Sequence, residues 1–176
     1  MKELIKKELN KFSIEPSLID NFIESVSEGL NQNGIEIWIN TIKSFSNSQT
    51  SRIIIKNIIE ETPAILRSIP QSQYLEWVKQ CYRISEVSED LSITYVNATT
   101  GVIENLKPRH LLDWGNIGLS LYRSSKNSTS LVNNFFKYSP SLCLKLNYEE
   151  LEILNDTLKR ISTRSISFSI KILDWV

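Results

Sequence analysis

The 176-residue sequence contains only five glycines, five prolines and two cysteines. So few turn-forming residues favour long regular elements over a fold of many short strands. The cysteines, Cys81 and Cys143, lie far apart, which indicates no disulfide framework and fits a reducing compartment. No stretch reaches the roughly 18 apolar residues of a membrane span, and the start "MKELIKKELNKF" lacks a signal-peptide core. We therefore expect a cytoplasmic protein without a membrane partner.

An excess of charge of either sign is also absent. Lys plus Arg and Asp plus Glu number 20 each, so the formal net charge is zero. A nucleic-acid binder usually carries a basic excess or a basic stripe, and the balance argues against such a partner. The apolar fraction of 41% is sufficient for a core, and the length suits one domain or one array of repeats.

Three tryptophans reveal an internal repeat. The spacings from Trp38 to Trp77 and from Trp77 to Trp114 are 39 and 37 residues, and the flanks read "IEIWINTIKSF", "YLEWVKQCYRI" and "LLDWGNIGLSL". The residues four and seven positions after each Trp lie on one helical stripe with it. A fourth copy, "LEILNDTLKRI", has Leu154 in place of Trp. We expect the tryptophans to pack between successive helices rather than form an exposed peptide-binding row, with Gly118 allowing a close helix approach near Trp114.

The second half of each unit aligns as well. The segments are "IIIKNIIEETPAILRSI", "DLSITYVNATTGVIENL" and "SLVNNFFKYSPSLCLKL". Phe135 and Phe136 occupy the positions of Ile58 and Ile59. The phenylalanine pair is therefore predicted to belong to the core and not to a ligand site.

Prolines recur at one place in this half. Thr62-Pro63 and Ser139-Pro140 align with Thr99-Thr100. Pro is tolerated at the first position of a helix, and a preceding Ser or Thr can cap it. The pattern predicts that a second helix ends here and a short third helix begins, although one helix kinked at the proline is an alternative.

Units of about 37–40 residues with two or three helices are typical of HEAT- and armadillo-like repeats. We therefore predict an all-α solenoid of HEAT/armadillo-like repeats. Its expected parts are N-terminal capping helices over residues 1–34, repeats over 35–73, 74–110 and 111–150, and a partial repeat over 151–176.

Both ends of this array carry further expectations. Helices are expected over residues 4–12 and 17–30, with Ser17 capping the second and Gly34 ending the loop that follows. The last unit finishes on "ISFSIKILDWV", which leaves apolar surface without a capping repeat. We expect the chain to be a fragment of a longer protein.

The tryptophan helix "LLDWGNIGLSL" followed by "NNFFKYSP" resembles the helical-repeat regions that precede the metal-binding von Willebrand A domain in certain bacterial proteins. These proteins partner MoxR-type AAA+ ATPases in activating nitric-oxide reductase or Rubisco. The resemblance covers residues 35–176 and implies a scaffold or adaptor with an AAA+ ATPase as a candidate partner. No "DxSxS" metal motif is present, so the metal-dependent activity is not implied.

Residues with potential chemistry have simpler interpretations. His110, the one histidine, follows "KPR" and is expected to be an exposed loop residue rather than a base or ligand. Cys81 and Cys143 fall on apolar stripes and are expected to be small hydrophobic core residues. No Cys or His ligands have zinc-site spacing. We predict no catalytic, cofactor-binding or metal-binding residue.

Charged pairs are expected to be solvated. Glu60-Glu61, Glu149-Glu150 and "SEVSED" are predicted at helix starts or ends, where acidic side chains are common. Two basic groups could each gather on one edge and contact phosphates: Lys107, Arg109 and Arg123, and Lys159, Arg160 and Arg164. The sequence favours a non-catalytic scaffold for protein–protein interaction, and a HEAT-like nucleic-acid-binding or repair protein is the alternative.

Overall fold

The computed structural model describes residues 2–175, and the chain divides into two compact units, residues 1–97 and 98–176. Every regular element within the described residues is helical, and none is a strand. The all-α prediction is therefore confirmed. The long helix α6 (Glu89–Ile103) contributes its first part to the first unit and its last residues to the second.

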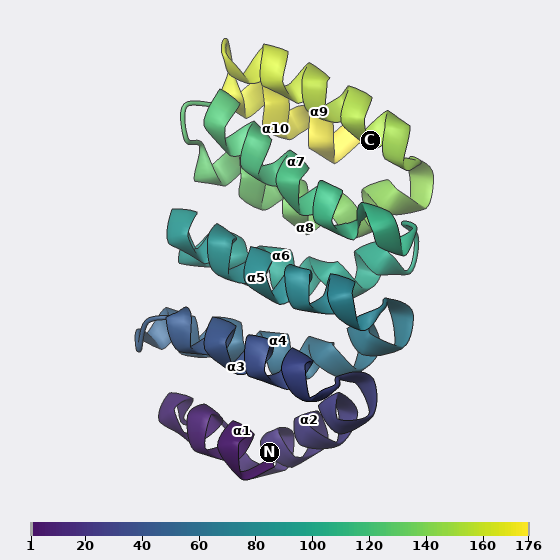
Figure 1. Cartoon of the computed structure of the whole chain (residues 1–176). Helices are drawn as coiled ribbons and strands as arrows, with labels where there is room; N and C mark the ends of the chain where they lie inside the picture. Colours follow the sequence, from purple (N-terminus) through teal and green to yellow (C-terminus); the bar gives the residue numbers. More distant parts are fainter. Residues whose placement is uncertain (1, 176) are drawn as a thin grey trace. The chain divides into compact units, whose positions relative to one another are not determined.

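The first unit is built from helices that contact the next helix but one along the chain. α2 packs on α4 and α3 packs on α5, while α1 lies against α2 and α3 (Figure 1). The element bounds are α1 (Lys2–Leu9), the 3-10 helix η1 (Asn10–Phe12), α2 (Pro16–Gly29), α3 (Gln32–Ser44), α4 (Gln49–Ser68) and α5 (Gln71–Val87). The two packed series place the core between two layers of helices.

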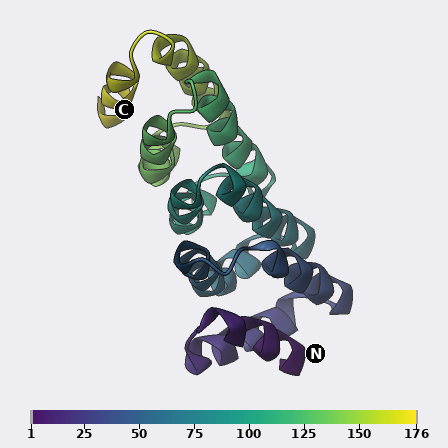
Figure 2. The same ribbon diagram turned by 90° about the vertical axis from the view of Figure 1, so that its left-hand side faces the viewer.

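The second unit repeats this arrangement. α7 packs on α9 and α8 packs on α10, and α7 and α8 contact each other. The bounds are η2 (Pro108–His110), α7 (Leu111–Ser124), α8 (Thr129–Lys145), α9 (Tyr148–Ser162) and α10 (Ile166–Trp175). Figure 2 shows α7 and α9 on one side of this unit and α8 and α10, in green and yellow, on the other.

Aromatic side chains fill both cores. Trp38, Trp77 and Trp114 are at most 1% exposed, so their predicted role in packing is confirmed. Phe135 and Phe136 are fully buried, as their alignment with Ile58 and Ile59 predicted. Within the second unit, the ring of Phe136 meets the edge of Trp114 at a centroid distance of 5.3 Å.

The predicted helix break before each proline is wrong. α4 continues through Pro63 and α8 continues through Pro140, so the second and third predicted helices form one helix. α6 likewise runs through Thr99 and Thr100. Proline removes one backbone hydrogen bond from a helix, but the segment after it still buries Ile65 in α4 and Leu142 in α8. This burial favours keeping both segments in one packed helix.

The hydroxyl before each proline links helices instead of capping one. Thr62 Oγ1 donates to the Ile58 carbonyl at 2.6 Å and lies 2.8 Å from the Tyr74 hydroxyl. Ser139 Oγ donates to the Phe135 carbonyl at 2.7 Å and accepts a hydrogen bond from Trp114 Nε1 at 2.8 Å. These contacts satisfy polar atoms that are buried between paired helices.

Two local expectations near the N-terminus also require correction. α2 begins at Pro16 with Glu15 before it, so Ser17 lies inside the helix and does not cap it. Pro is favoured at this first position because its missing N–H would have no partner there. Gly34 lies in α3 and not in a loop, because Asn31 Oδ1 caps that helix by accepting the Gly34 N–H at 2.9 Å.

Candidate functional site

The surface of the second unit is hollowed between α7 and α9. This groove has a volume of about 380 Å³. α7 contributes Asp113, Asn116, Ile117 and Ser120 to its lining. α9 contributes Tyr148, Glu152, Asn155, Asp156 and Lys159. Eight of these nine side chains are polar, so the groove suits a polar or charged partner group.

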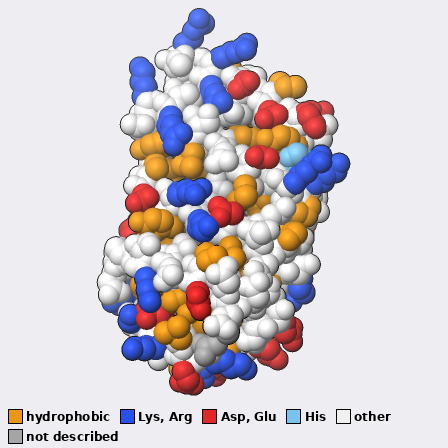
Figure 3. All heavy atoms as spheres, in the orientation of Figure 1, with side chains coloured by type: hydrophobic (Ala, Val, Ile, Leu, Met, Phe, Trp, Pro, Cys, Tyr) orange, Lys and Arg blue, Asp and Glu red, His pale blue; other side chains and the backbone are white. Residues whose placement is uncertain are grey.

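Acidic groups outnumber basic ones along this groove. Lys159 pairs with Asp156 at 3.3 Å, and Glu152 accepts a hydrogen bond from the Tyr148 hydroxyl at 3.1 Å. Within residues 2–175, no Lys or Arg forms an ion pair with Asp113 or Glu152. Figure 3 shows acidic side chains close to the pale-blue histidine on this face. The groove therefore keeps negative charge without a basic partner.

Asn155 adds an unsatisfied polar group to the same groove. Its side chain lines the groove, and the residue is only 4% exposed. Its Oδ1 is buried and accepts no hydrogen bond within the described part of the chain. A buried amide oxygen without a donor is destabilising, so a ligand that donates a hydrogen bond here would relieve that deficit.

His110 lies at the rim of the groove, and the prediction of an exposed loop histidine is wrong. Its side chain is 15% exposed, and its ring stacks on Tyr148 with centroids 4.0 Å apart and planes 12° apart. Nε2 accepts a hydrogen bond from Arg109 Nε at 3.1 Å, while Nδ1 lies 3.6 Å from Asp113 Oδ2. The histidine thus connects the short helix η2 to the start of α9.

The same surroundings change the pKa of Tyr148. Burial raises the pKa of its phenol to about 12, and hydrogen bonding to Glu152 acts in the same direction. The hydroxyl is therefore protonated at neutral pH and donates to Glu152. This donation orients the Glu152 carboxylate at the edge of the groove.

We predict that His110→Ala lowers the free energy of unfolding by about 1 kcal/mol, the size of a stacked aromatic pair. The stack on Tyr148 is lost, whereas an exposed loop residue would have little to lose. Urea denaturation measures the change. His110→Phe keeps a flat ring and is expected to lose less; an alanine variant as stable as wild type would mean that the stack adds no stability.

The first unit has a groove between α3 and α5 at corresponding positions. Its volume is about 540 Å³. In α3 and α7, the residues that line the two grooves lie at the same positions relative to Trp38 and Trp114. These residues are Ile37, Asn40, Thr41 and Ser44 in α3, and Asp113, Asn116, Ile117 and Ser120 in α7. α5 supplies Lys79, Tyr82, Arg83 and Glu86. Each unit thus has a groove lined by matching positions of one of its helices. The charged residues of the first groove are Lys79, Arg83 and Glu86, and those of the second are Asp113, Glu152, Asp156 and Lys159.

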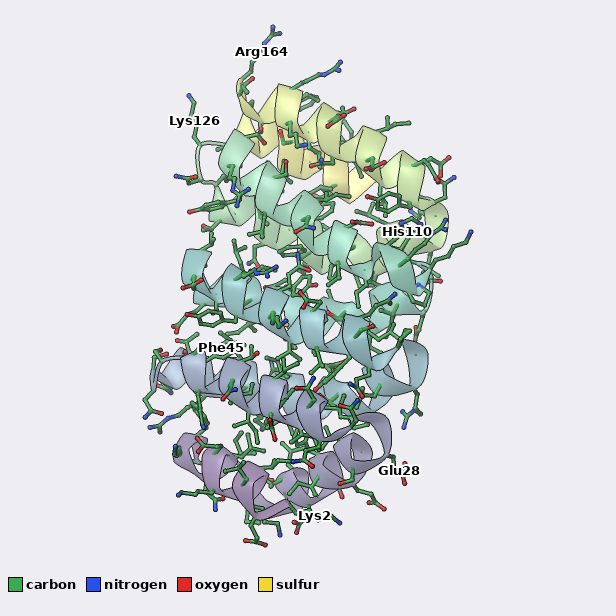
Figure 4. The ribbon with its side chains drawn as sticks, in the orientation of Figure 1. Lys2, Glu28, Phe45, His110, Lys126 and Arg164 are labelled. Carbon is green, nitrogen blue, oxygen red and sulfur yellow. The ribbon has the colours of Figure 1, made fainter. Side chains whose placement is uncertain are left out.

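The predicted basic groups are only partly brought together. Lys107 and Arg109 line a small cavity of about 140 Å³ beside His110. Arg123 lies in the last turn of α7, 14 residues beyond Arg109, which corresponds to about 20 Å along the helix. Figure 4 marks the two ends of α7 by His110 and Lys126. In the other predicted group, Lys159 is paired with Asp156, and Arg160 and Arg164 are exposed towards the end of α9 and just beyond it.

Several of the candidate carboxylates have structural partners. Glu60 and Glu61 lie inside α4 rather than at a helix end, because that helix continues through Pro63, and Glu60 is 3.7 Å from Lys56. Glu150 completes a capping box with Asn147 at the start of α9. In "SEVSED", Glu89 accepts hydrogen bonds from Ser51 and Ser48 at 2.8 Å each, and these bonds lower the pKa of its carboxyl.

Both cysteines are buried, as predicted, and neither forms a disulfide. Burial raises the pKa of the Cys81 thiol well above its usual value and that of Cys143 to about 11. A raised pKa leaves little of the reactive thiolate at neutral pH. Within residues 2–175, no group of three or more His, Cys, Asp or Glu side chains is placed to hold a metal ion.

No helix in the described part of the chain combines the length and the apolar character that crossing a membrane requires.

Comparisons of the chain with protein-family models, with curated proteins and with solved structures give no match.

Proposed function

We propose that this chain is a non-catalytic HEAT- or armadillo-like scaffold that binds a partner protein through the groove between α3 and α5 and the groove between α7 and α9. The observation that carries the proposal is the shared register of the two grooves. Positions at the same offsets from Trp38 and Trp114 line the α3–α5 groove and the α7–α9 groove. Helical repeats commonly vary the residues of such surface positions while the buried positions maintain the packing.

The charges of these grooves favour a protein partner over a nucleic acid. The α3–α5 groove presents Arg83, Glu86 and a Lys79 that is paired with Glu76 at 2.6 Å, whereas the α7–α9 groove presents Asp113 and Glu152. A phosphate backbone requires positive charge along its path, and the second groove would repel it. A protein can offer charges of both signs and match each groove in turn.

The proposal also covers the identity of the partner and the cellular compartment of the chain. The resemblance to regions that accompany MoxR-type ATPases makes an AAA+ ATPase one candidate partner. Both cysteines are free thiols, which favours a reducing, cytoplasmic setting. The proposed activity is binding alone, since the candidate carboxylates make structural contacts and the cysteine thiols have raised pKa values.

We predict that the chain has no useful affinity for duplex DNA at physiological salt. Duplex binding depends largely on neutralising phosphates, and a chain with zero net charge lacks the main driving force. A titration against labelled duplex at two salt concentrations tests this. Micromolar binding that weakens steeply with salt would overturn the scaffold proposal and favour a HEAT-like nucleic-acid binder.

A further inference from the structure

We propose that the groove between α7 and α9 is a docking site for a basic peptide segment of the partner, with a Lys or Arg side chain seated between Asp113 and Glu152. This inference rests on the proposed scaffold function and assigns a ligand chemistry to one of its grooves. Three independent features of the groove lead to it.

The first feature is unbalanced negative charge. Asp113 and Glu152 come from different helices, line the same groove, and have no ion-pair partner among the Lys and Arg residues between positions 2 and 175. Asp156, the third carboxylate, already has Lys159 at 3.3 Å. A cation entering the groove would therefore meet two carboxylates that no internal cation neutralises. Charge-assisted hydrogen bonds to carboxylates are about twice as strong as neutral ones.

The second feature is the unsatisfied amide of Asn155. Its Oδ1 is buried without a donor, and its side chain forms part of the groove wall. An ammonium or guanidinium group brings several N–H donors to one place, so it can bond both carboxylates and leave a donor for an amide oxygen. A carboxylate or phosphate ligand would have no donor to offer this oxygen and would be repelled by the two acids.

The third feature is a series of side-chain contacts along the rim. His110 stacks on Tyr148, and the Tyr148 hydroxyl holds Glu152 by a 3.1 Å hydrogen bond. Side chains fixed before binding lose less conformational entropy when a ligand arrives. The volume of about 380 Å³ lies at the small end of ligand sites, which suits one long side chain of a peptide whose backbone runs along the surface.

Fluorescence anisotropy tests the site with the full chain and a short labelled peptide of alternating lysine and serine. The same peptide with glutamine replacing each lysine is the ligand control. We expect saturable binding of the lysine peptide, and a loss of about tenfold or more for the double variant Asp113→Asn, Glu152→Gln, since each hydrogen bond to a charged group contributes about this factor. Both substitutions keep an oxygen acceptor, so the Tyr148 contact can persist.

Glu149→Gln is the matched control variant. Glu149 lies on the same helix as Glu152 and the substitution makes the same charge change, but Glu149 lines the cavity beside His110 and not the groove. Unchanged affinity in this variant supports a specific site. Three outcomes would overturn the proposal. They are an equal loss of affinity in both variants, no binding of the lysine peptide, and competition by free propylamine as strong as that by unlabelled peptide.

A glutamate–serine peptide separates this inference from the proposed function. One outcome is that the glutamate–serine peptide binds, the double variant Lys79→Gln, Arg83→Gln abolishes this binding, and the lysine peptide does not bind. That outcome overturns the basic-peptide site and leaves the scaffold function standing. If neither peptide binds and duplex DNA does, with a steep salt dependence, both are overturned.

Discussion

Phe135→Ala should lower the free energy of unfolding by about 3–5 kcal/mol, the usual range for removing a fully buried phenyl ring. The side chain is 0% exposed in α8, and its centroid lies 5.8 Å from that of Phe136. Alanine would leave a cavity that the surrounding helices can fill only in part. Urea denaturation should show a lower midpoint with an unchanged slope.

Leu144→Ala on the same helix is the matched control. Leu144 is 72% exposed, so its truncation should change stability by no more than about 0.5 kcal/mol. If Phe135→Ala were as mild as Leu144→Ala, the ring would be exposed in solution and the interpretation of the phenylalanine pair as a ligand site would return.

Gly118→Ala should lower the free energy of unfolding by about 1–3 kcal/mol, as expected when an atom is forced into a packed core. A Cβ placed on Gly118 would clash with Cζ of Phe136. That ring cannot retreat freely, because it is fully buried and packs against Trp114. The added methyl group must therefore displace the ring or separate α7 from α8.

A double-mutant cycle with Phe136→Leu tests this cause. The shorter leucine frees the space that the alanine methyl group needs, so the double variant should be more stable than the sum of the single effects predicts. Additive effects would show that the cost of Gly118→Ala arises elsewhere than at the Phe136 contact.

The buried positions of the fold could be predicted because apolar residues recur at similar spacings along the sequence. Trp38, Trp77 and Trp114 recur at similar spacings and are all buried, and the aligned positions of Ile58 and Phe135 are buried as well. The same reasoning failed at Pro63 and Pro140. Local sequence favours a helix break at these positions, but apolar residues beyond each proline are held in the core and outweigh one missing backbone hydrogen bond.

The candidate site was much less predictable. His110 and Tyr148 are 38 positions apart, and only packing of η2 near the start of α9 brings their rings together. At the matched groove positions, Asn40 corresponds to Asn116 and Ser44 to Ser120, but the sequence alone does not show that a groove forms there. Asn155 becomes informative only through its burial, which a sequence does not display.

The most direct test of the account is to locate where a peptide binds. In an NMR titration of the isotope-labelled chain with the lysine–serine peptide, we expect the amide signals of Asp113, Asn116 and Asn155 to shift together with ligand concentration. Signals of α10 around Phe168 and Trp175 should stay in place, although these aromatic side chains are 45% and 73% exposed. Shifts confined to α10, or no shifts in α7 and α9 at saturating peptide, would contradict the claim that the groove between α7 and α9 binds a basic peptide segment.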